Sequence, residues 1–456
     1  MKNWEVGGHW WLPGREGNKV PGTLAFDPKS GGTLTLIGAL LEVEEVATAE
    51  ATGDGGFSIE IGEDEIEAAG TYQRIYGRAD NRDFTLEEGQ ESHRSGGMLW
   101  MSTSRQVVHV NRIFEGAHLP EGGAPSGNGL IVTLDGLTAW TGRTGITGKV
   151  LVSSSEEFPP QYTVQGSRLP IDRVEVEAGG QLSLRHYLNS DGEAGIRGLR
   201  ESFDLKVNYP DPTDAESLVD IASDLQDLVS LGTGRSAAFG KIAVLHPDVQ
   251  RNLGNSTERT PIHLYAAWTA QKTTGNKPLT GHDLFFTLED LGGLEAVARW
   301  LRTAGKHRQS LSRVMATRYD RTKHVADRYL DCIASLERLN RDEAGDSNQT
   351  VSLERRLRRC TNLAGAPITR LIPDVEAWIK VLKSDRDNVA HHYGRRLRQH
   401  TAEQYYLAES AFWLFVCCML RLSEAPDAVF DRIVEHEQFQ FLRRRLERFV
   451  PTAPAM

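Results

Sequence analysis

The chain has 456 residues and a formal net charge of −10, with 39% apolar and 25% charged residues. This length suits about two to four domains with buried cores, and the composition is that of an ordinary globular protein. An acidic chain is not a general nucleic-acid coat, which would be basic overall. The sequence has no Walker-type glycine-rich loop, which argues against nucleotide hydrolysis.

No stretch of the sequence predicts a secretion signal or a membrane segment. The N-terminus lacks the basic-then-apolar pattern of a signal peptide. The longest apolar run covers residues 411–420, about half the length that spans a bilayer. We therefore expect a cytoplasmic protein without membrane contact, in which this run forms a buried core helix.

The cysteines are expected to be reduced core thiols. The sequence has four of them, Cys332, Cys360, Cys417 and Cys418. None has the Cys-x2-Cys or Cys/His spacing of a zinc site, and adjacent cysteines rarely form a disulfide. No metal ion or cofactor is predicted.

Residues 1–210 predict a β-rich domain. The first 200 residues hold 32 of the 44 glycines, and glycine favours tight turns over helices. Apolar or alternating runs predict strands at 23–26, 33–37, 57–61, 107–110, 131–134 and 181–184. Short strands with glycine-rich turns indicate a sandwich or an open barrel. The polar segment 81–97 is predicted to be a mobile loop.

Residues 211–300 predict a smaller mixed α/β module. Asp214 is placed to cap a helix whose apolar residues recur at helical spacing, Leu218, Ile221, Leu225 and Leu228. Strand-like segments follow at 242–245 and 262–265. This module is expected to complete the front half of the chain.

Residues 301–456 predict an all-helical domain, because they hold only 4 of the 44 glycines and carry apolar stripes at helical spacing. The fold class expected for the whole chain is therefore α+β multidomain. Lys and Arg outnumber Asp and Glu by 27 to 20 over residues 301–450, whereas residues 1–100 hold 8 against 18. Contact with nucleic acid is thus expected in the helical part. Ser384 and Asp387 match a capping box that would begin a helix there.

An arginine and a histidine in this helical part have the chemistry to cleave RNA. Arg386 and His391 stand five positions apart. A guanidinium holds a phosphate, and an imidazole transfers protons near neutral pH. The same spacing occurs in two further pairs, Arg302 with His307 and Arg395 with His400. We favour Arg386 and His391 because the predicted helix start would aim backbone N–H groups at a phosphate.

Arg386-Asp387-x3-His391, within helices of this order, resembles the motif of the HEPN ribonucleases, in which a polar residue follows the arginine and the histidine stands four to six positions after it. Most members of that family have Asn at the polar position, whereas this chain has Asp387 followed by Asn388. Residues 329–337 also resemble the first long helix of the family.

The front of the chain is similar to the N-terminal domain of the ApeA anti-phage proteins. The likeness lies in residues 8–14, 20–24, 34–38 and 113–119. The two resemblances together cover nearly the whole chain. They imply a bacterial abortive-infection effector with a sensor domain at 1–210 and a HEPN ribonuclease domain at 301–456. Such an effector is silent until a phage-derived protein triggers it, and then cuts host RNA, with tRNA the expected target.

The resemblance also implies roles for the site residues. HEPN cleavage uses no metal ion and leaves a 2′,3′-cyclic phosphate and a 5′-OH. His391 is expected to act as general base or acid, and Arg386 to hold the phosphate. Supporting roles are expected for Asp387, Asn388, His392 and Tyr393. Because one motif supplies few groups, we expect a homodimer or higher oligomer, formed through the helical domain, that brings two motifs to one cleft.

Two alternatives stay open. Arg386 could pair with a neighbouring aspartate on a helix surface with His391 simply exposed, which would leave a non-catalytic HEPN scaffold that dimerises or binds RNA. The tryptophans at positions 4, 10 and 11 could make the front domain a ligand-binding β-sandwich, or they could pack its core.

Overall fold

In the computed structural model, the chain divides into two compact units. The first comprises Met1–Thr133, Lys206–Ala222 and Ala238–Lys272, and the second Leu134–Leu205, Ser223–Ala237 and Thr273–Met456. The structure describes residues 3–41, 48–51, 57–60, 70–95, 105–120, 126–151, 161–192, 198–252, 254, 257–270, 278–320, 323–345, 351–390 and 401–450. The domain boundaries predicted from the sequence, at 210 and 300, stay predictions.

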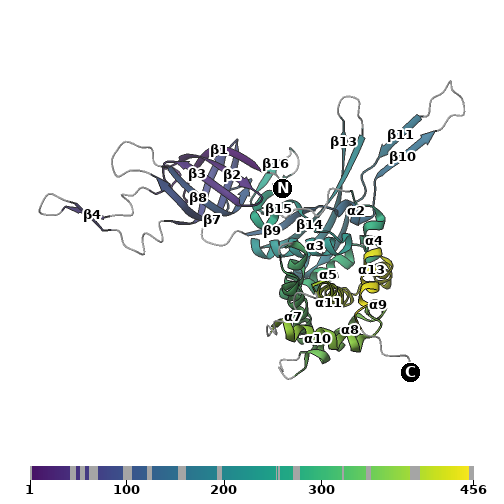
Figure 1. Ribbon diagram of the computed structural model, residues 1–456. Helices are drawn as coiled ribbons and strands as arrows, with labels where there is room; N and C mark the ends of the chain where they lie inside the picture. Colours follow the sequence, from purple (N-terminus) through teal and green to yellow (C-terminus); the bar gives the residue numbers. More distant parts are fainter. Residues whose placement is uncertain are drawn as a thin grey trace, which may run out of the picture. The chain divides into compact units, whose positions relative to one another are not determined.

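The first unit contains a closed antiparallel barrel (Figure 1). Its strands are β1 (Trp4–Trp11), β2 (Val20–Asp27), β3 (Gly31–Ile37), β6 (Thr71–Ala79), β7 (Arg82–Ser95) and β8 (Arg105–Glu115). They follow the order β8-β3-β2-β1-β6-β7, and β7 pairs back onto β8. The β-rich front predicted from the glycine-rich turns is thus confirmed, and of the predicted sandwich or open barrel it forms a barrel, which is closed.

Further strands extend the sheet of this unit from β8, in the order β18-β15-β9-β14. They are β18 (Ile262–Ala266), β15 (Phe239–Leu245), β9 (Ser126–Leu134) and β14 (Gly198–Asp214), which belongs to this unit from Lys206 onward. Two small hairpins add β4 (Thr48–Ala51) with β5 (Phe57–Glu60), and β16 (Gln250–Asn252) with β17 (Thr257–Arg259). The strands predicted at 242–245 and 262–265 are confirmed.

Tryptophans pack the barrel. The Trp10 side chain is 0% exposed, and its indole N–H donates to the carbonyl oxygen of Gly22 at 3.1 Å. A Cβ on Gly77 would lie 2.1 Å from the Trp10 ring, so only glycine fits opposite this indole. Trp11 is buried, and Trp4 packs half-buried against the same core. The packing alternative therefore holds for this cluster.

The prediction of a mobile loop at 81–97 is wrong over most of its length. Residues Arg82–Ser95 form β7, which pairs with β6 on one side and with β8 on the other. Phe84 and Leu86 are 0% exposed, and the buried Glu87 accepts a 2.8 Å hydrogen bond from Arg74. The segment looked loop-like because a buried ion pair and a solvent-facing side put many charges in one strand.

The helix predicted after Asp214 is confirmed. It is α3 (Ala215–Thr233), and the Asp214 carboxylate accepts the backbone N–H of Ser217 at 2.8 Å. This hydrogen bond satisfies one of the free N–H groups of the first turn. The hydroxyl and the amide of Ser217 lower the pKa of Asp214.

The second unit combines β-hairpins with a helical bundle. Its hairpins are β10 (Ile146–Leu151) with β11 (Gln161–Gly166), and β12 (Asp172–Val176) with β13 (Gly180–Asp191). Short helices are α2 (Leu137–Thr141) and α4 (Leu288–Leu291). The bundle consists of α5 (Leu294–Lys306), α6 (Arg308–Tyr319), α7 (Val325–Ala344), α8 (Leu353–Ala364), α9 (Ala366–Leu371), α10 (Val375–Ala390), α11 (Thr401–Leu422), α12 (Asp427–Glu435) and α13 (Glu437–Leu446) (Figure 1).

Helix α11 forms the centre of this bundle. Residues 411–420 are all buried, which confirms the predicted core helix. By length and composition α11 could cross a membrane. However, 72% of its apolar 18-residue stretch is buried within the protein, as in a core helix. All four cysteines are free and buried, as predicted. With a β-rich front and a helical back, the predicted α+β class is confirmed.

Candidate functional site

The Arg386 segment lies on α10, which is held by two neighbouring helices. Trp378 is 0% exposed, and its indole N–H donates to the hydroxyl of Ser410 on α11 at 3.0 Å. The buried hydroxyl of Tyr329, on α7, donates to the carbonyl oxygen of Leu382 at 2.5 Å. Burial raises the pKa of Tyr329 well above its usual value, so this hydroxyl remains a donor. These buried hydrogen bonds fix where α10 sits in the bundle.

Arg386 is half-exposed near the described end of α10. Its side chain is 37% exposed, and Nη1 lies 3.2 Å from Oδ1 of Asp387. The preceding residue, Asp385, accepts a 3.1 Å hydrogen bond from Gln404 of α11. The guanidinium can therefore reach a phosphate in solvent, while Asp387 limits its orientations. Asn388 is exposed on the same helix.

The predicted helix start at Ser384 is wrong. Helix α10 runs without a break from Val375 to Ala390, so Arg386 lies well past its first turn. The N-terminus of α10 is instead capped by Asp374, whose carboxylate accepts the backbone N–H of Ala377 at 2.9 Å. Backbone N–H groups of a helix start are thus not available at Arg386, and its guanidinium must supply the positive charge. The capping-box pattern predicted a helix start wrongly because its polar residues also suit the solvent-facing surface of a continuous helix.

The remaining predicted site residues, His391, His392 and Tyr393, lie outside the described residues. The alternative pair Arg395 and His400 lies there as well. Their predicted roles stay predictions.

The third arginine–histidine pair is structural. Arg302 is 63% exposed and lies 3.1 Å from a carboxylate oxygen of Glu177. The His307 side chain is 1% exposed, and its Nε2 lies 3.0 Å from Oε1 of Glu343. Burial lowers the pKa of His307. A solvated arginine and a buried histidine offer no shared surface to a phosphodiester.

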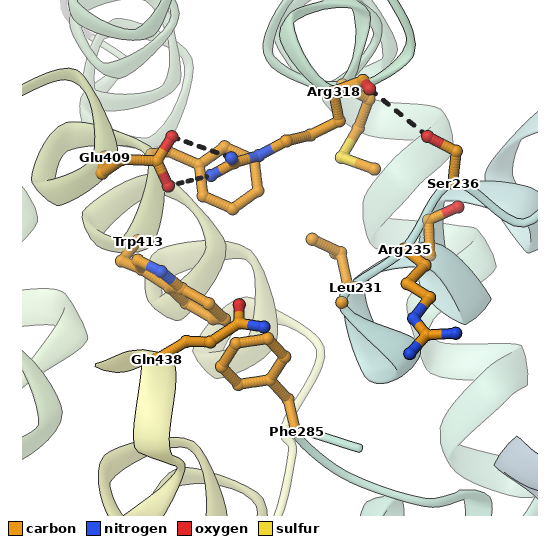
Figure 2. Close-up of a pocket in the computed structure, with 12 residues that line it drawn as sticks. Leu231, Arg235, Ser236, Phe285, Arg318, Glu409, Trp413 and Gln438 are labelled. Carbon is orange, nitrogen blue, oxygen red and sulfur yellow. Dashed lines mark hydrogen bonds and ion pairs between the residues drawn. The ribbon is translucent and has the colours of Figure 1, made fainter. Parts of the chain in front are cut away.

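A cavity of about 170 Å³ lies in the second unit, between the last turn of α3 with the segment after it and helices α6, α11 and α13 (Figure 2). Figure 2 shows Trp413, Gln438 and Phe285 on one side of it and Leu231, Arg235 and Ser236 on the other. Along its edge, both Nη atoms of Arg318 lie 2.8 Å from the two carboxylate oxygens of Glu409. The guanidinium of Arg318 stacks on the Phe412 ring, 3.5 Å from its centroid. This cavity joins aromatic surface to hydrogen-bonding groups, which is typical of ligand sites.

Sequence reasoning missed this cavity. Its lining comes from distant segments, around residues 230–236, Phe285, α6, α11 and α13. None of these segments contains a recognisable motif, and only the folded arrangement of helices brings Arg318 to Glu409. The apolar run of α11 signalled burial alone.

A buried carboxyl beside the cavity predicts a pH-dependent stability. Asp227 is 4% exposed, and Tyr319 donates its hydroxyl to Oδ1 at 2.5 Å. Burial raises the pKa of Asp227 to about 7. In the unfolded chain this group titrates near pH 4. Between about pH 4 and pH 7 the folded state keeps a proton that the unfolded chain has lost, so stability falls as pH rises, by up to about 1.4 kcal/mol per pH unit.

Replacing Asp227 with asparagine is expected to remove this pH dependence while keeping an acceptor for Tyr319. The four cysteines are all buried in the second unit, so the rate at which they react with a thiol reagent reports the opening of that unit. We expect wild type and variant to open similarly at about pH 4, and the variant to open more slowly at about pH 7.5. If wild type and variant opened at equal rates at each of the two pH values, Asp227 would have its ordinary pKa in the folded protein.

Among the described residues, no group of three or more His, Cys, Asp or Glu side chains is arranged to hold a metal ion. The buried thiols support no reactive role either, because burial raises the pKa of Cys332 and of Cys417 to about 12.

Comparison with known proteins places the front of the chain in a family. Comparison with curated proteins and with solved structures gives no match. A family model described as ApeA N-terminal domain 1 matches residues 5–300, more than half of the 456 residues. The match covers the barrel strands and continues past α4. The chain therefore belongs to the ApeA family of anti-phage defence proteins.

Proposed function

We propose that this ApeA-family chain is a metal-independent HEPN endoribonuclease, with Arg386 and His391 as its catalytic pair. The observation that carries the proposal is the position of Arg386. It is a half-exposed arginine on a helix buried on its other side, five residues before His391, in a chain whose front belongs to a defence family. The pair Arg302 and His307 lacks this combination, since His307 is buried; the pair Arg395 and His400 lies outside the described residues.

The proposed reaction is an intramolecular transesterification, in which the neighbouring 2′ oxygen replaces the 5′ oxygen on phosphorus. A base removes the 2′-OH proton, O2′ attacks phosphorus, and the bond to the 5′ oxygen breaks. The products are a 2′,3′-cyclic phosphate and a 5′-OH that takes up a proton. The reaction needs the 2′-OH, so RNA and not DNA is the substrate.

In this reaction His391 serves as base or acid, and Arg386 stabilises the charge on the non-bridging oxygens. Asp387 orients the Arg386 guanidinium through the 3.2 Å ion pair, and Asn388 lies beside it in sequence. His392 and Tyr393 are proposed supporting residues. A single motif contains one catalytic imidazole, so acid and base come from two copies in a homodimer or higher oligomer formed by the helical domain.

The proposed biology follows from the family. The protein stays silent in the cytoplasm until a phage-derived protein acts on the N-terminal sensor domain. It then cleaves host RNA, with tRNA as the proposed target, and uses no cofactor or membrane.

The test is a cleavage assay on total RNA and on tRNA in the presence of EDTA, with the protein alone and with lysate from phage-infected cells. We expect cleavage on triggering, with 3′ ends that resist ligation until the cyclic phosphate is removed. Cleavage that EDTA abolishes, or products with a 5′-phosphate, would contradict the proposed mechanism.

A non-catalytic HEPN scaffold is the competing proposal, and the Arg386–Asp387 pair itself favours it, because such a pair also suits an inert helix surface. A scaffold would protect phage-infected cells equally well with alanine at position 391. A ligand-binding front domain without nuclease activity would respond to barrel substitutions alone.

A further inference from the structure

An aromatic groove runs between α11 and α13. It has a volume of about 360 Å³ and shares Glu409, Trp413 and Gln438 with the cavity of Figure 2. Its other aromatic residues are Tyr405, Tyr406 and Phe441. The groove therefore continues a ring-lined surface into the interior of the second unit.

Two of these rings are exposed at an energetic cost. Tyr405 is 39% exposed and Phe441 is 42% exposed. The Tyr406 ring lies between them, 5.5 Å from Tyr405 and 6.3 Å from Phe441, in edge-to-face arrangements. On an inert protein surface, exposed apolar residues occur singly and scattered. Exposed aromatic rings grouped in one hollow are instead typical of a binding surface.

The charges around the groove favour an anionic partner. Arg444 lines it, and the guanidinium of Arg445 lies 4.7 Å from the centroid of the Phe441 ring. Of the two carboxylates in the lining, Glu409 is engaged by Arg318, which leaves Glu437 against the two arginines. Rings interleaved with guanidinium groups suit bases and phosphates of a single strand.

The helix that supplies Tyr405 to the groove, α11, is joined to the helix that carries Arg386, α10. The hydrogen bond between Gln404 and Asp385 joins the first turn of α11 to α10 at 3.1 Å. Tyr405 follows Gln404 in the chain, and Arg386 follows Asp385. A strand whose phosphate lies at Arg386 on α10 would thus extend across to α11, the helix that supplies Tyr405 and Tyr406 to the groove.

We propose that this groove binds unpaired nucleotides of RNA by stacking their bases on Tyr405 and Phe441, with Arg444 and Arg445 on the phosphates. This inference deepens the proposed nuclease function and rests on it for the identity of the strand. Stacking needs free base faces, so a single strand or loop binds and a perfect duplex does not. The exposed side-chain amide of Gln438 lines both the groove and the cavity, and no described residue hydrogen-bonds to it, so it offers a donor and an acceptor to a base edge.

The test is the affinity of the full chain, carrying His391→Ala so that no RNA is consumed, for a fluorescent oligo-uridine strand measured by anisotropy. Tyr405→Ala and Phe441→Ala are each expected to weaken binding by about 5- to 100-fold, the usual loss for one stacked base. Phe441→Trp should restore it. Arg444→Ala should make the plot of the logarithm of the binding constant against the logarithm of salt concentration less steep, by the amount expected for about one lost phosphate contact.

The matched control is Leu363→Ala, since Leu363 is a similarly exposed apolar residue (37%) on α8 and does not line the groove. The inference would be overturned by any of three results: Phe441→Ala leaves the affinity for the strand unchanged, a duplex binds as tightly as the single strand, or the His391→Ala protein with an intact groove does not bind the strand. Dissociation of an oligomer by Phe441→Ala without loss of RNA affinity would assign the groove to contact between copies. Failure of the nuclease proposal is separate, because it appears as cleavage that survives His391→Ala.

Discussion

Replacing His391 with alanine is expected to lower the rate of RNA cleavage by about 10²- to 10⁴-fold, the usual contribution of general acid–base catalysis. The cause is loss of the imidazole that moves the 2′-OH or 5′-oxygen proton. Binding of RNA should change little, so the loss falls on the rate constant. The measurement is the single-turnover cleavage rate of purified, triggered protein on tRNA, together with cell survival during phage infection.

Arg386→Ala is expected to cost a comparable factor, about 10²-fold or more, because a preorganised charge on the non-bridging oxygens is lost. Arg386→Lys should not restore activity, since an ammonium cannot form the planar, two-pronged contact. Matched controls come from the pairs with the same spacing. Arg302→Ala removes a 63% exposed arginine, and His400→Ala removes a histidine close in sequence. Wild-type cleavage by His391→Ala, or equal losses in the controls, would favour the scaffold.

Much of the fold is readable from local signals. Glycine content separated the β-rich front from the helical back, and alternation placed β2, β3 and β8. Asp214 marked the start of α3 because an aspartate cap acts within a few residues. Each of these signals concerns neighbours in sequence. Closure of the barrel depends instead on the pairing of β7 with β8. No local signal showed this pairing, because the polar sequence of β7 resembles that of a loop.

The candidate site shows the same division. The spacing of Arg386 and His391 is a local property, and a family likeness gave it meaning. The continuity of α10 through Ser384 depends on burial of Trp378 and Leu382, so packing overrode a capping pattern. The cavity and the aromatic groove depend on which helices meet. A sequence contains no short-range sign that Arg318 will contact Glu409.

Arg318→Met is expected to destabilise the second unit by about 3 kcal/mol, the lower end of the cost of breaking a buried ion pair. The lower end applies because the Arg318 and Glu409 side chains retain 28% and 17% exposure. The loss comes from Glu409, left in the cavity wall without its two 2.8 Å contacts, and from the stacking on Phe412. The measurement is the native-state reactivity of the buried cysteines, expected to rise about 100-fold.

The double variant Arg318→Met/Glu409→Leu separates charge from packing. Because two apolar side chains leave no unpaired charge, most of the lost stability should return. The control is Arg370→Met, since the pair that Arg370 forms with Asp431 is 56% and 61% exposed, and it should change stability by less than about 1 kcal/mol. If the double variant were as unstable as Arg318→Met alone, the contact with Phe412 and the shape of the cavity wall, and not the ion pair, would hold α6 against α11.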